Sequence, residues 1–291
     1  MTGSMPLLSG AATIAGVVGA PIRHSLSPRL HGAWIAAAGL DAAYVPFGPS
    51  DGGFEALING FRGGVVSGVN VTLPFKERAL HLADHVDEAA RMAGAANLLL
   101  FHGDGGVEAR NTDGLGLLHA FARQAPDWRP DAGPIVVLGA GGAARGAVAA
   151  LARAGATDIR VLNRTQARAE AIAALLPCKA FGWRDAGQAY AGARTVINAT
   201  SAGLHGDDAL PLPDRTPGDE AYAMDMVYTP LRTAFLAKAE GVGFRTVDGL
   251  DMLIGQAIPS FAALFGRPPP VELDARALLL AALSPKTGEH Q

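Results

Sequence analysis

A glycine-rich turn that joins an apolar strand to a helix constrains this chain more than any other feature. The short β-branched run Ile135–Leu138 is followed directly by Gly139-Ala140-Gly141-Gly142-Ala143-Ala144. In such a turn the first glycine permits a tight bend, the second lets the backbone approach a pyrophosphate, and a small third residue lets helix and strand pack closely. Glycine turns also occur with nothing bound, but both flanking elements are present here, so we expect residues 139–143 to bind a dinucleotide.

The residues after the next predicted strand, Asp158–Leu162, indicate which dinucleotide binds. An acidic side chain about 20 residues after the glycine turn would bind the ribose hydroxyls of NAD. This chain instead has Asn163-Arg164-Thr165, with Arg168 one helical turn further on. The planar guanidinium of Arg164 suits a 2′-phosphate, and Thr165 adds a hydroxyl donor. The sequence therefore predicts NADP; the alternative is that Thr165 only caps a helix and both arginines are solvated.

Short apolar β-rich runs alternate with Ala- and Leu-rich helical stretches along the whole chain, which predicts an α/β fold with mostly parallel sheets covered by helices. At 291 residues the chain is long enough for two domains, and the breaker-rich segment 124–134 favours a boundary near it. We expect a substrate-binding domain at 1–118, to which the C-terminal helices in 250–291 return, and a Rossmann-like domain at 119–249. Further strands are expected at 13–18, 43–47, 65–69 and 97–101, and helices at 115–123, 250–265 and 272–283.

Composition argues against several classes of function. Hydrophobic residues make up 49% and charged residues 18% of the chain, which is typical of a packed globular protein. A net charge of −3 without a Lys- or Arg-rich run argues against nucleic acid as a partner. We see no apolar run close to the roughly 20 residues that span a bilayer. Cys178 is the only cysteine, so we expect no Cys-based metal site, and a reducing, cytoplasmic setting.

A second polar segment, Asn70-Val71-Thr72-Leu73-Pro74-Phe75-Lys76, lies in the first predicted domain. We expect a strand to end there and a helix to begin at about Pro74. Asn70, Thr72 and Lys76 would then gather at the carboxyl end of a strand, where α/β sheets bind ligands. In the first turn of a helix a cation is disfavoured by about 0.3 to 1 kcal/mol. Taken alone, a solvated lysine beside Glu77 is the simpler interpretation.

The complementary segment is Asn111-Thr112-Asp113, just before the predicted helix Leu115–Arg123. Asp113 is well suited to cap that helix. A role in proton transfer would require Asp113 to lie near Lys76, and the pair would then act as one coupled unit. The sequence by itself leaves both interpretations open.

In this order, the motifs resemble those of the shikimate dehydrogenase family. Besides the segments above, the resemblance covers Gly19–Pro28, Gly94–Asn97, Asn198–Ser201, Asp225–Tyr228 and Asp248–Ala257. It implies two α/β domains, the first for substrate and the second for NADP. It also implies a small-molecule substrate and an enzyme that reversibly reduces 3-dehydroshikimate to shikimate, in the chorismate pathway of aromatic amino acid biosynthesis.

The resemblance further implies roles for particular residues. Lys76 and Asp113 would be the proton-transfer pair, and Ser25 and Ser27 would hold the substrate carboxylate. The ring hydroxyls would be bound by Thr72, Asn97, Tyr228 and Gln256, and the nicotinamide side of the cofactor by Ser201, Met226, Gly249 and Met252. From the residues alone, Ser27 is instead predicted to be the N-cap of a helix that begins with Pro28.

Two departures from the family pattern concern the substrate. Gly32 stands where an Asn commonly follows the helix histidine, His31, and Leu98 stands where Thr commonly follows Asn97. A quinate or aminoshikimate dehydrogenase is therefore an alternative, and a sensor that binds such a metabolite without turnover is a remoter one. The spacing of His24 and His31 matches no metal motif, so both are expected to be structural. The oligomeric state is left open, with a homodimer among the options.

Overall fold

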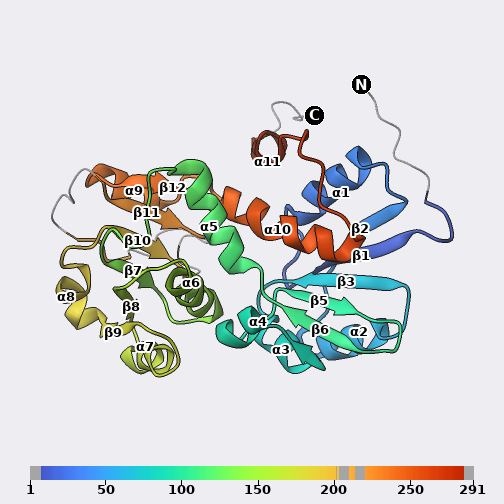
Figure 1. Ribbon diagram of the computed structural model, residues 1–291, viewed down its shortest axis with the longest axis horizontal. Helices are drawn as coiled ribbons and strands as arrows, with labels where there is room; N and C mark the ends of the chain where they lie inside the picture. Colours follow the sequence, from blue (N-terminus) through green and yellow to red (C-terminus); the bar gives the residue numbers. More distant parts are fainter. Residues whose placement is uncertain (1–7, 201, 203–209, 214–219, 285–291) are drawn as a thin grey trace, which may run out of the picture. The chain divides into compact units, whose positions relative to one another are not determined.

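The computed structural model describes residues 8–200, 202, 210–213 and 220–284. These residues form two compact units, each built on one six-stranded sheet (Figure 1). The first unit takes the described residues of Met1–Val86, Ala96–Arg110 and Ala257–Gln291, and the second takes Asp87–Ala95 and the described residues of Asn111–Gln256. The chain therefore passes from one unit to the other four times.

The first unit has a mixed sheet in the order β2-β1-β3-β5-β6-β4. Its strands are β1 (Thr13–Val18), β2 (Ala42–Phe47), β3 (Val66–Val71), β4 (His85–Val86), β5 (Leu98–Phe101) and β6 (Val107–Arg110), and its helices are α1 (Ser27–Ala37), α2 (Phe54–Phe61), α3 (Lys76–His81), the end of α10 (Leu250–Phe265) and α11 (Ala275–Leu283). Strands β1, β2 and β3 are parallel, whereas β5 runs antiparallel to β3 and β6.

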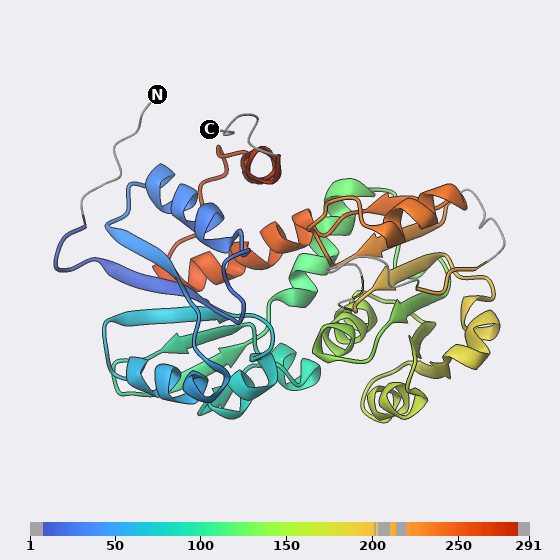
Figure 2. The same cartoon turned by 180° about the vertical axis from the view of Figure 1, so that it is seen from behind.

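Alternation along β3 shows how the two faces of this sheet are covered. Val69 and Val71 point to one face and pack in a cluster with Phe54 of α2 and Phe75 just before α3. Asn70 points to the other face, because successive strand side chains alternate. Figures 1 and 2 show α1 on the side of the sheet opposite to α2.

The second unit has a sheet in the order β12-β11-β10-β7-β8-β9, in which every recorded strand pair is parallel. Its strands are β7 (Ile135–Leu138), β8 (Ile159–Asn163), β9 (Lys179–Gly182), β10 (Thr195–Asn198), β11 (Tyr222–Asp225) and β12 (Arg245–Val247), and its helices are α4 (Glu88–Ala93), α5 (Asp113–Gln124), α6 (Gly142–Arg153), α7 (Gln166–Ala173), α8 (Ala186–Tyr190), α9 (Ala234–Gly241) and the start of α10.

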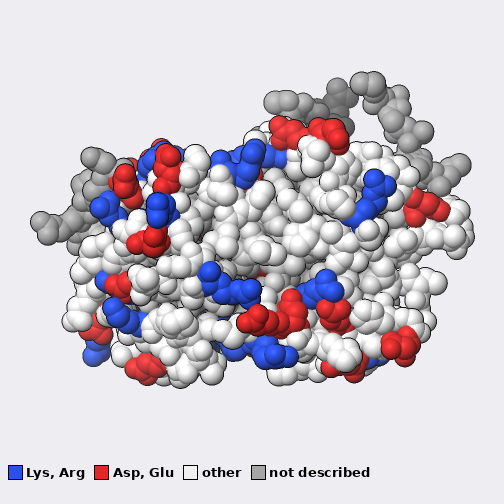
Figure 3. All heavy atoms as spheres, in the orientation of Figure 1, with Lys and Arg blue, Asp and Glu red and all other residues white. Residues whose placement is uncertain are grey.

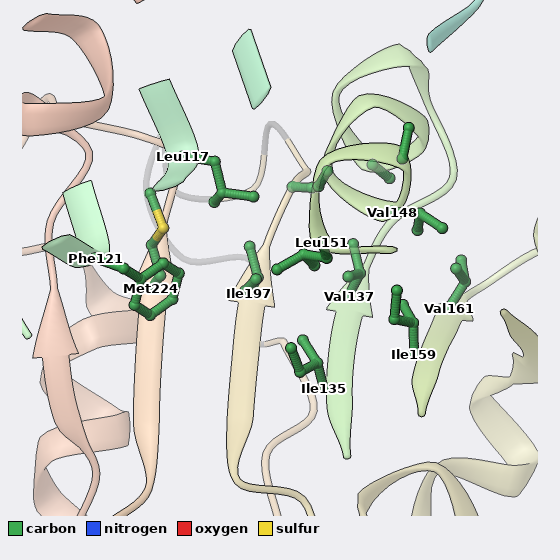
Figure 4. Packing of buried hydrophobic residues seen from close by; sticks show 14 of the residues in the cluster. Leu117, Phe121, Ile135, Val137, Val148, Leu151, Ile159, Val161, Ile197 and Met224 are labelled. Carbon is green, nitrogen blue, oxygen red and sulfur yellow. The ribbon is translucent and has the colours of Figure 1, made fainter. Parts of the chain in front are cut away.

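The central strand β7 is buried on both faces, which explains why its sequence is continuously apolar. Ile135 and Val137 pack with Leu117 and Phe121 of α5 and with Leu151 of α6 (Figure 4). The alternate residues Val136 and Leu138 belong to a second cluster, on the opposite face, which includes residues of α8 and α9. Helices on both faces of a parallel sheet define a doubly wound α/β unit.

The predicted α/β fold is confirmed, and so are most of the predicted elements. β1, β7 and α10 have the predicted bounds, and the other predicted elements differ by no more than three residues at either end. The antiparallel strand β6 and the two-residue strand β4 were not predicted, and β9 to β12 were expected only as part of the α/β alternation, without bounds of their own. The predicted domain bounds, 1–118 with 250–291 and 119–249, stay a prediction, because compactness divides the chain at other residues and groups α4 and α5 with α6.

Surface charge is mixed in sign. On the face shown in Figure 3, the described Lys and Arg side chains alternate with Asp and Glu on each unit. Among the described residues, no helix is long and apolar enough to span a membrane. No group of three or more His, Cys, Asp or Glu side chains in this part of the chain is placed to hold a metal ion.

Candidate active site

The carboxyl ends of β1 and β3 lie side by side in the first unit, because the two strands are parallel neighbours. The Thr72 N–H donates to the carbonyl oxygen of Val18 at 2.9 Å, and the Ala20 N–H donates to that of Leu73 at 3.1 Å. Gly19 is required there, because a Cβ atom would lie 2.4 Å from Cγ2 of Thr72. The segment after β1, which carries Ser25 and Ser27, therefore shares one sheet edge with Thr72.

Asn97 reaches the same edge from the opposite direction. It immediately precedes β5, which is antiparallel to β3, and its carbonyl oxygen accepts the Val71 N–H at 2.9 Å. The carbonyl oxygen of Lys76, the first residue of α3, accepts the Ala96 N–H at 2.9 Å. The first unit thus gathers five of the predicted site residues at one edge of its sheet: Ser25, Ser27, Thr72, Lys76 and Asn97.

The start of α1 corrects one interpretation of Ser27. The N-cap of α1 is Leu26, and Ser27 is the first helical residue, followed by Pro28. The prediction that Ser27 is the N-cap is therefore wrong. The Ser25 hydroxyl oxygen accepts the Ser27 N–H at 3.3 Å, so a short turn places both serines at the beginning of the helix.

A buried polar network centred on Asn70 lies next to this edge of the sheet. The Asn70 amide nitrogen donates to the Asn97 carbonyl oxygen at 3.1 Å and to the Ser260 hydroxyl at 3.0 Å, and its amide oxygen accepts the Tyr44 hydroxyl at 2.8 Å. Asn70 therefore ties the backbone at Asn97 to β2 and α10 rather than facing a ligand. Burial raises the pKa of the Tyr44 phenol well above its usual range.

In the second unit the glycine turn follows β7, at the point where the strand order reverses between β7 and β10. Gly139 has a φ of +102°, and a Cβ atom there would lie 2.9 Å from Thr200 Cγ2. Gly141 is the extended N-cap of α6, and a Cβ atom at Gly141 would meet nothing within 4 Å. The first N–H groups of α6 have no partner within the helix, so they suit an anion placed at this open turn.

The neighbouring strand β8 ends at Asn163, whose side-chain amide donates to the Thr165 carbonyl oxygen at 2.8 Å. Arg164, Thr165 and Arg168 are all exposed. Thr165 is the N-cap residue of α7, yet within the described chain its hydroxyl makes no capping hydrogen bond. Thr165 therefore occupies the N-cap position without a side-chain cap, and both arginines are exposed, so the structure leaves open both the NADP site and the alternative of a helix cap with solvated arginines.

A buried carboxylate organises the loops after β10 and β11. Asp225 accepts hydrogen bonds from the Asn198 amide at 2.9 Å, the Val227 N–H at 3.0 Å and the Thr233 hydroxyl at 2.5 Å. Burial raises the pKa of Asp225, and the three donors oppose that shift. This network holds the segment with Met226 and Tyr228 at the carboxyl edge of the sheet. Ser201 lies outside the described residues.

The start of α10 is held against the same edge. A Cβ atom at Gly249 would lie 2.7 Å from the Met226 carbonyl oxygen, so only glycine fits there. The amide nitrogen of Gln124, on α5, donates to the Asp248 carbonyl oxygen at 3.1 Å, and its amide oxygen accepts the Asp248 N–H at 3.0 Å. These contacts place Gly249 beside the β11 loop, and Met252 and Gln256 follow on α10, where both lie against Gly116 of α5.

Asp113 is the first residue of α5, whose N-cap is Thr112. The interpretation of Asp113 as the N-cap is therefore wrong. The Asp113 N–H donates to the amide oxygen of Asn111 at 3.0 Å, and the Asn111 amide nitrogen donates to the Ala95 carbonyl oxygen at 2.8 Å. Asp113 belongs to the second unit and Lys76 to the first, so their proximity stays a prediction.

Sequence reasoning did not predict the supporting contacts of three polar residues: Asn111 and Asp225, which it placed in motifs without a role of their own, and Gln124, which it did not single out. Asn111 follows β6 and Asp225 ends β11, next to predicted site residues, and this position is the signal that could have indicated a supporting role. Gln124 carries no such signal, because its partner Asp248 is distant in sequence.

The second unit is a parallel sheet with an open glycine turn at its switch point. The next strand is followed by a solvent-facing arginine and not by an acidic residue. These features are those of a dinucleotide-dependent α/β oxidoreductase. Comparison with known proteins identifies the family. Three family models match: the shikimate dehydrogenase substrate binding domain at residues 17–99, shikimate / quinate 5-dehydrogenase at 124–205, and the shikimate 5′-dehydrogenase C-terminal domain at 249–279.

Individual relatives match over almost their full length. A shikimate dehydrogenase (NADP(+)) of Caulobacter vibrioides is 56% identical over 95% of this chain and 98% of its own, and one of Cereibacter sphaeroides is 46% identical over 92% and 97%. A crystal structure of shikimate 5-dehydrogenase from Thermus thermophilus, in complex with NADP(H) and shikimate, is 35% identical with a TM-score of 0.82, over 93% of this chain and 99% of that one. The chain belongs to the shikimate dehydrogenase family, as its motifs predict.

Proposed function

We propose that this protein is an NADP-dependent shikimate dehydrogenase, which reversibly reduces 3-dehydroshikimate to shikimate. One observation carries the proposal: an open glycine turn lies at the switch point of the second sheet, and the exposed Arg164 follows the neighbouring strand. The names of the relatives and the ligands of the Thermus enzyme agree with this interpretation. We further propose a cytoplasmic location and a homodimer. Sedimentation at micromolar concentration would test the homodimer.

The residues present fit a bound NADP. Gly139 permits the tight bend and Gly141 leaves the backbone of the turn open to a pyrophosphate, and we expect Ala140, Gly142 and Ala143 to complete the cofactor site. We expect Arg164 to bind the 2′-phosphate, aided by Asn163, Thr165 and Arg168. Ser201, Met226, Gly249 and Met252 are expected to surround the nicotinamide. When bound, NADPH supplies the hydride.

Residues of the first unit are expected to hold the substrate. The hydroxyls of Ser25 and Ser27 would donate to the carboxylate, while Thr72 and Asn97, together with Tyr228 and Gln256, would fix the ring hydroxyls. Such positioning lowers the barrier by holding the reacting carbonyl in one orientation. As the carbonyl carbon gains a hydride, its oxygen becomes an alkoxide, and Lys76 with Asp113 would deliver the proton that neutralises it.

The two departures from the family pattern have different weight in the structure. Leu98 is fully buried in β5, so its side chain is part of the core and offers no surface to a ligand. A Cβ atom at Gly32 would meet nothing within 4 Å, so the glycine leaves open space beside the middle of α1. We expect any change in substrate preference to arise at Gly32 rather than at Leu98.

The decisive assay follows NADPH oxidation after addition of 3-dehydroshikimate, 3-dehydroquinate or the amino analogue, each with NADPH and with NADH. We expect 3-dehydroshikimate with NADPH to give the highest kcat/KM. Binding without turnover would favour the sensor, and preference for another ring would favour the paralogue. Lys76→Ala should lower kcat by about 100-fold or more, because general acid catalysis contributes that much. A folded Lys76→Ala protein with nearly unchanged kcat would contradict the assignment.

A further inference from the structure

Arg145 stands in the first turn of α6, directly after the glycine turn, where a cation would be expected to reach for a phosphate. Its guanidinium is engaged elsewhere. Nε donates to the Met92 carbonyl oxygen at 2.8 Å and Nη2 donates to that of Arg91 at 3.2 Å. These are the carbonyls at the end of α4, where a helix presents unsatisfied acceptors and partial negative charge. Arg145 therefore binds the C-terminus of α4.

The segment that follows α4 is shaped around this contact. Gly94 ends α4 in the left-handed conformation, with a φ of +62°, and a Cβ atom there would lie 2.3 Å from Nη1 of Arg145. A Cβ atom at Gly142 would in turn lie 3.2 Å from Cβ of Ala95. A side chain at Gly94 would therefore be strained and would displace the Arg145 guanidinium, and one at Gly142 would require a small shift of Ala95.

The same segment also holds the residue before Asp113. The carbonyl oxygen of Ala95 accepts the Asn111 amide nitrogen at 2.8 Å, and the Asn111 amide oxygen accepts the Asp113 N–H at 3.0 Å. A continuous chain of contacts within the second unit therefore runs from the guanidinium of Arg145, through Gly94 and Ala95, to the start of α5.

We propose that Arg145 is a positioning residue: by clamping the end of α4 to the cofactor turn, it fixes the Ala95 carbonyl that holds Asn111 and so sets the orientation of Asp113. In this proposal Arg145 acts through its contacts with the Met92 and Arg91 carbonyl oxygens and not through phosphate or substrate. The effect on catalysis rests on the proposed function, in which Asp113 takes part in proton transfer. The structural part of the inference does not depend on the proposed function. It says only that Arg145 holds the end of α4 against α6 and thereby orders the contacts from Gly94 to Asp113.

The kinetic test compares Arg145→Gln with Arg145→Lys and with Arg153→Gln. Arg153 is a matched control, because it also lies on α6 and pairs with Glu88 of α4 at 3.2 Å, but at an exposed position. We expect Arg145→Gln to lower kcat by about tenfold or more, since small displacements of a reacting group have effects of that order. The KM for NADPH should change by less than about threefold, because no phosphate contact is lost. Arg145→Lys should recover part of kcat, and Arg153→Gln should behave as wild type.

A second measurement is independent of turnover. Amide hydrogen exchange in the free protein should rise about tenfold or more at residues 94–96 and at Asp113 in Arg145→Gln, with β7 and β8 unchanged. If wild type does not turn over 3-dehydroshikimate, the proposed function fails while the exchange result still tests the clamp. A KM for NADPH raised tenfold with unchanged kcat would show that Arg145 is a phosphate ligand and would overturn the inference. Unchanged exchange at residues 94–96 and Asp113 would overturn it as well.

Discussion

His31 shows how a single polar side chain can set the pH range in which the first unit is stable. It is fully buried in α1, stacked on Tyr44 with ring centroids 4.0 Å apart and in edge contact with Trp34. In the described part of the chain, neither ring nitrogen has a hydrogen-bond partner. Burial lowers the pKa of His31 from 6.5 to about 3. The histidine is therefore neutral in the folded protein at pH 7, and its full burial among aromatic rings fits a structural role.

The sign of the resulting pH effect follows from that shift. Between about pH 6.5 and pH 3 the unfolded chain binds a proton at His31 that the folded chain does not, so acid favours unfolding. We expect the free energy of unfolding to fall by up to about 1.4 kcal/mol per pH unit in this window from this group alone. His31→Phe, which keeps an aromatic ring, should reduce that slope. Chemical denaturation at pH 7.5 and pH 5 measures the free energy of unfolding of wild type and of His31→Phe. If both proteins lose the same free energy between these pH values, His31 is not the source of the pH dependence.

At the scale of elements, the crossing of α5 and the start of α10 depends on two glycines. A Cβ atom at Gly116 would lie 2.5 Å from the Met252 carbonyl oxygen, and one at Gly255 would lie 2.4 Å from Cβ of His119. The helices therefore pack with their backbones close together. This crossing also places Gln256, a proposed substrate ligand, at the side of α5.

We expect Gly116→Ala to destabilise the protein by about 1 to 3 kcal/mol, because the added methyl meets backbone that cannot move away cheaply. Gly60→Ala is the matched control. Gly60 lies in α2, has nothing within 4 Å of its Cβ position, and should gain about 0.4 to 1 kcal/mol from lower unfolded-state entropy. Urea unfolding measures the free energy of unfolding of both variants and of wild type. A Gly116→Ala protein as stable as wild type would show that the helix crossing tolerates a side chain.

Elements that follow from local pattern were predictable, and contacts between distant segments were not. The strand, glycine turn and helix at 135–153 are specified by neighbouring residues, and the structure has them there. The strands β4 and β6 were missed because their short sequences become strands only by pairing with partners elsewhere. The site residues share this division: Gly139 and Arg164 carry a local signal, whereas the Gln124 contact with Asp248 exists only after folding. N-caps were misplaced by one residue at α1 and α5, where turns outside the helix decide its start.

For the whole molecule, NADPH should act as a stabiliser, because a ligand that binds only the folded state shifts the unfolding equilibrium. At a concentration about 100 times its dissociation constant, the gain is about 2.7 kcal/mol. Arg164→Ala should remove much of the increase in unfolding temperature caused by NADPH while leaving that caused by NADH unchanged. Thermal unfolding with each nucleotide checks this, and an equal loss with both would place Arg164 away from the 2′-phosphate.

The four passages of the chain between the units bear on how the protein is made. The sheet of the first unit comes from the first 110 residues, yet Ser260 and Phe261, which contact Asn70 and His31, belong to the last part of the chain. A ribosome therefore releases this sheet long before the helix that covers it, and synthesises the whole second unit in between. During that interval His31 and Trp34 lack their contacts with Phe261, so we expect the nascent chain to expose apolar surface that is prone to aggregation.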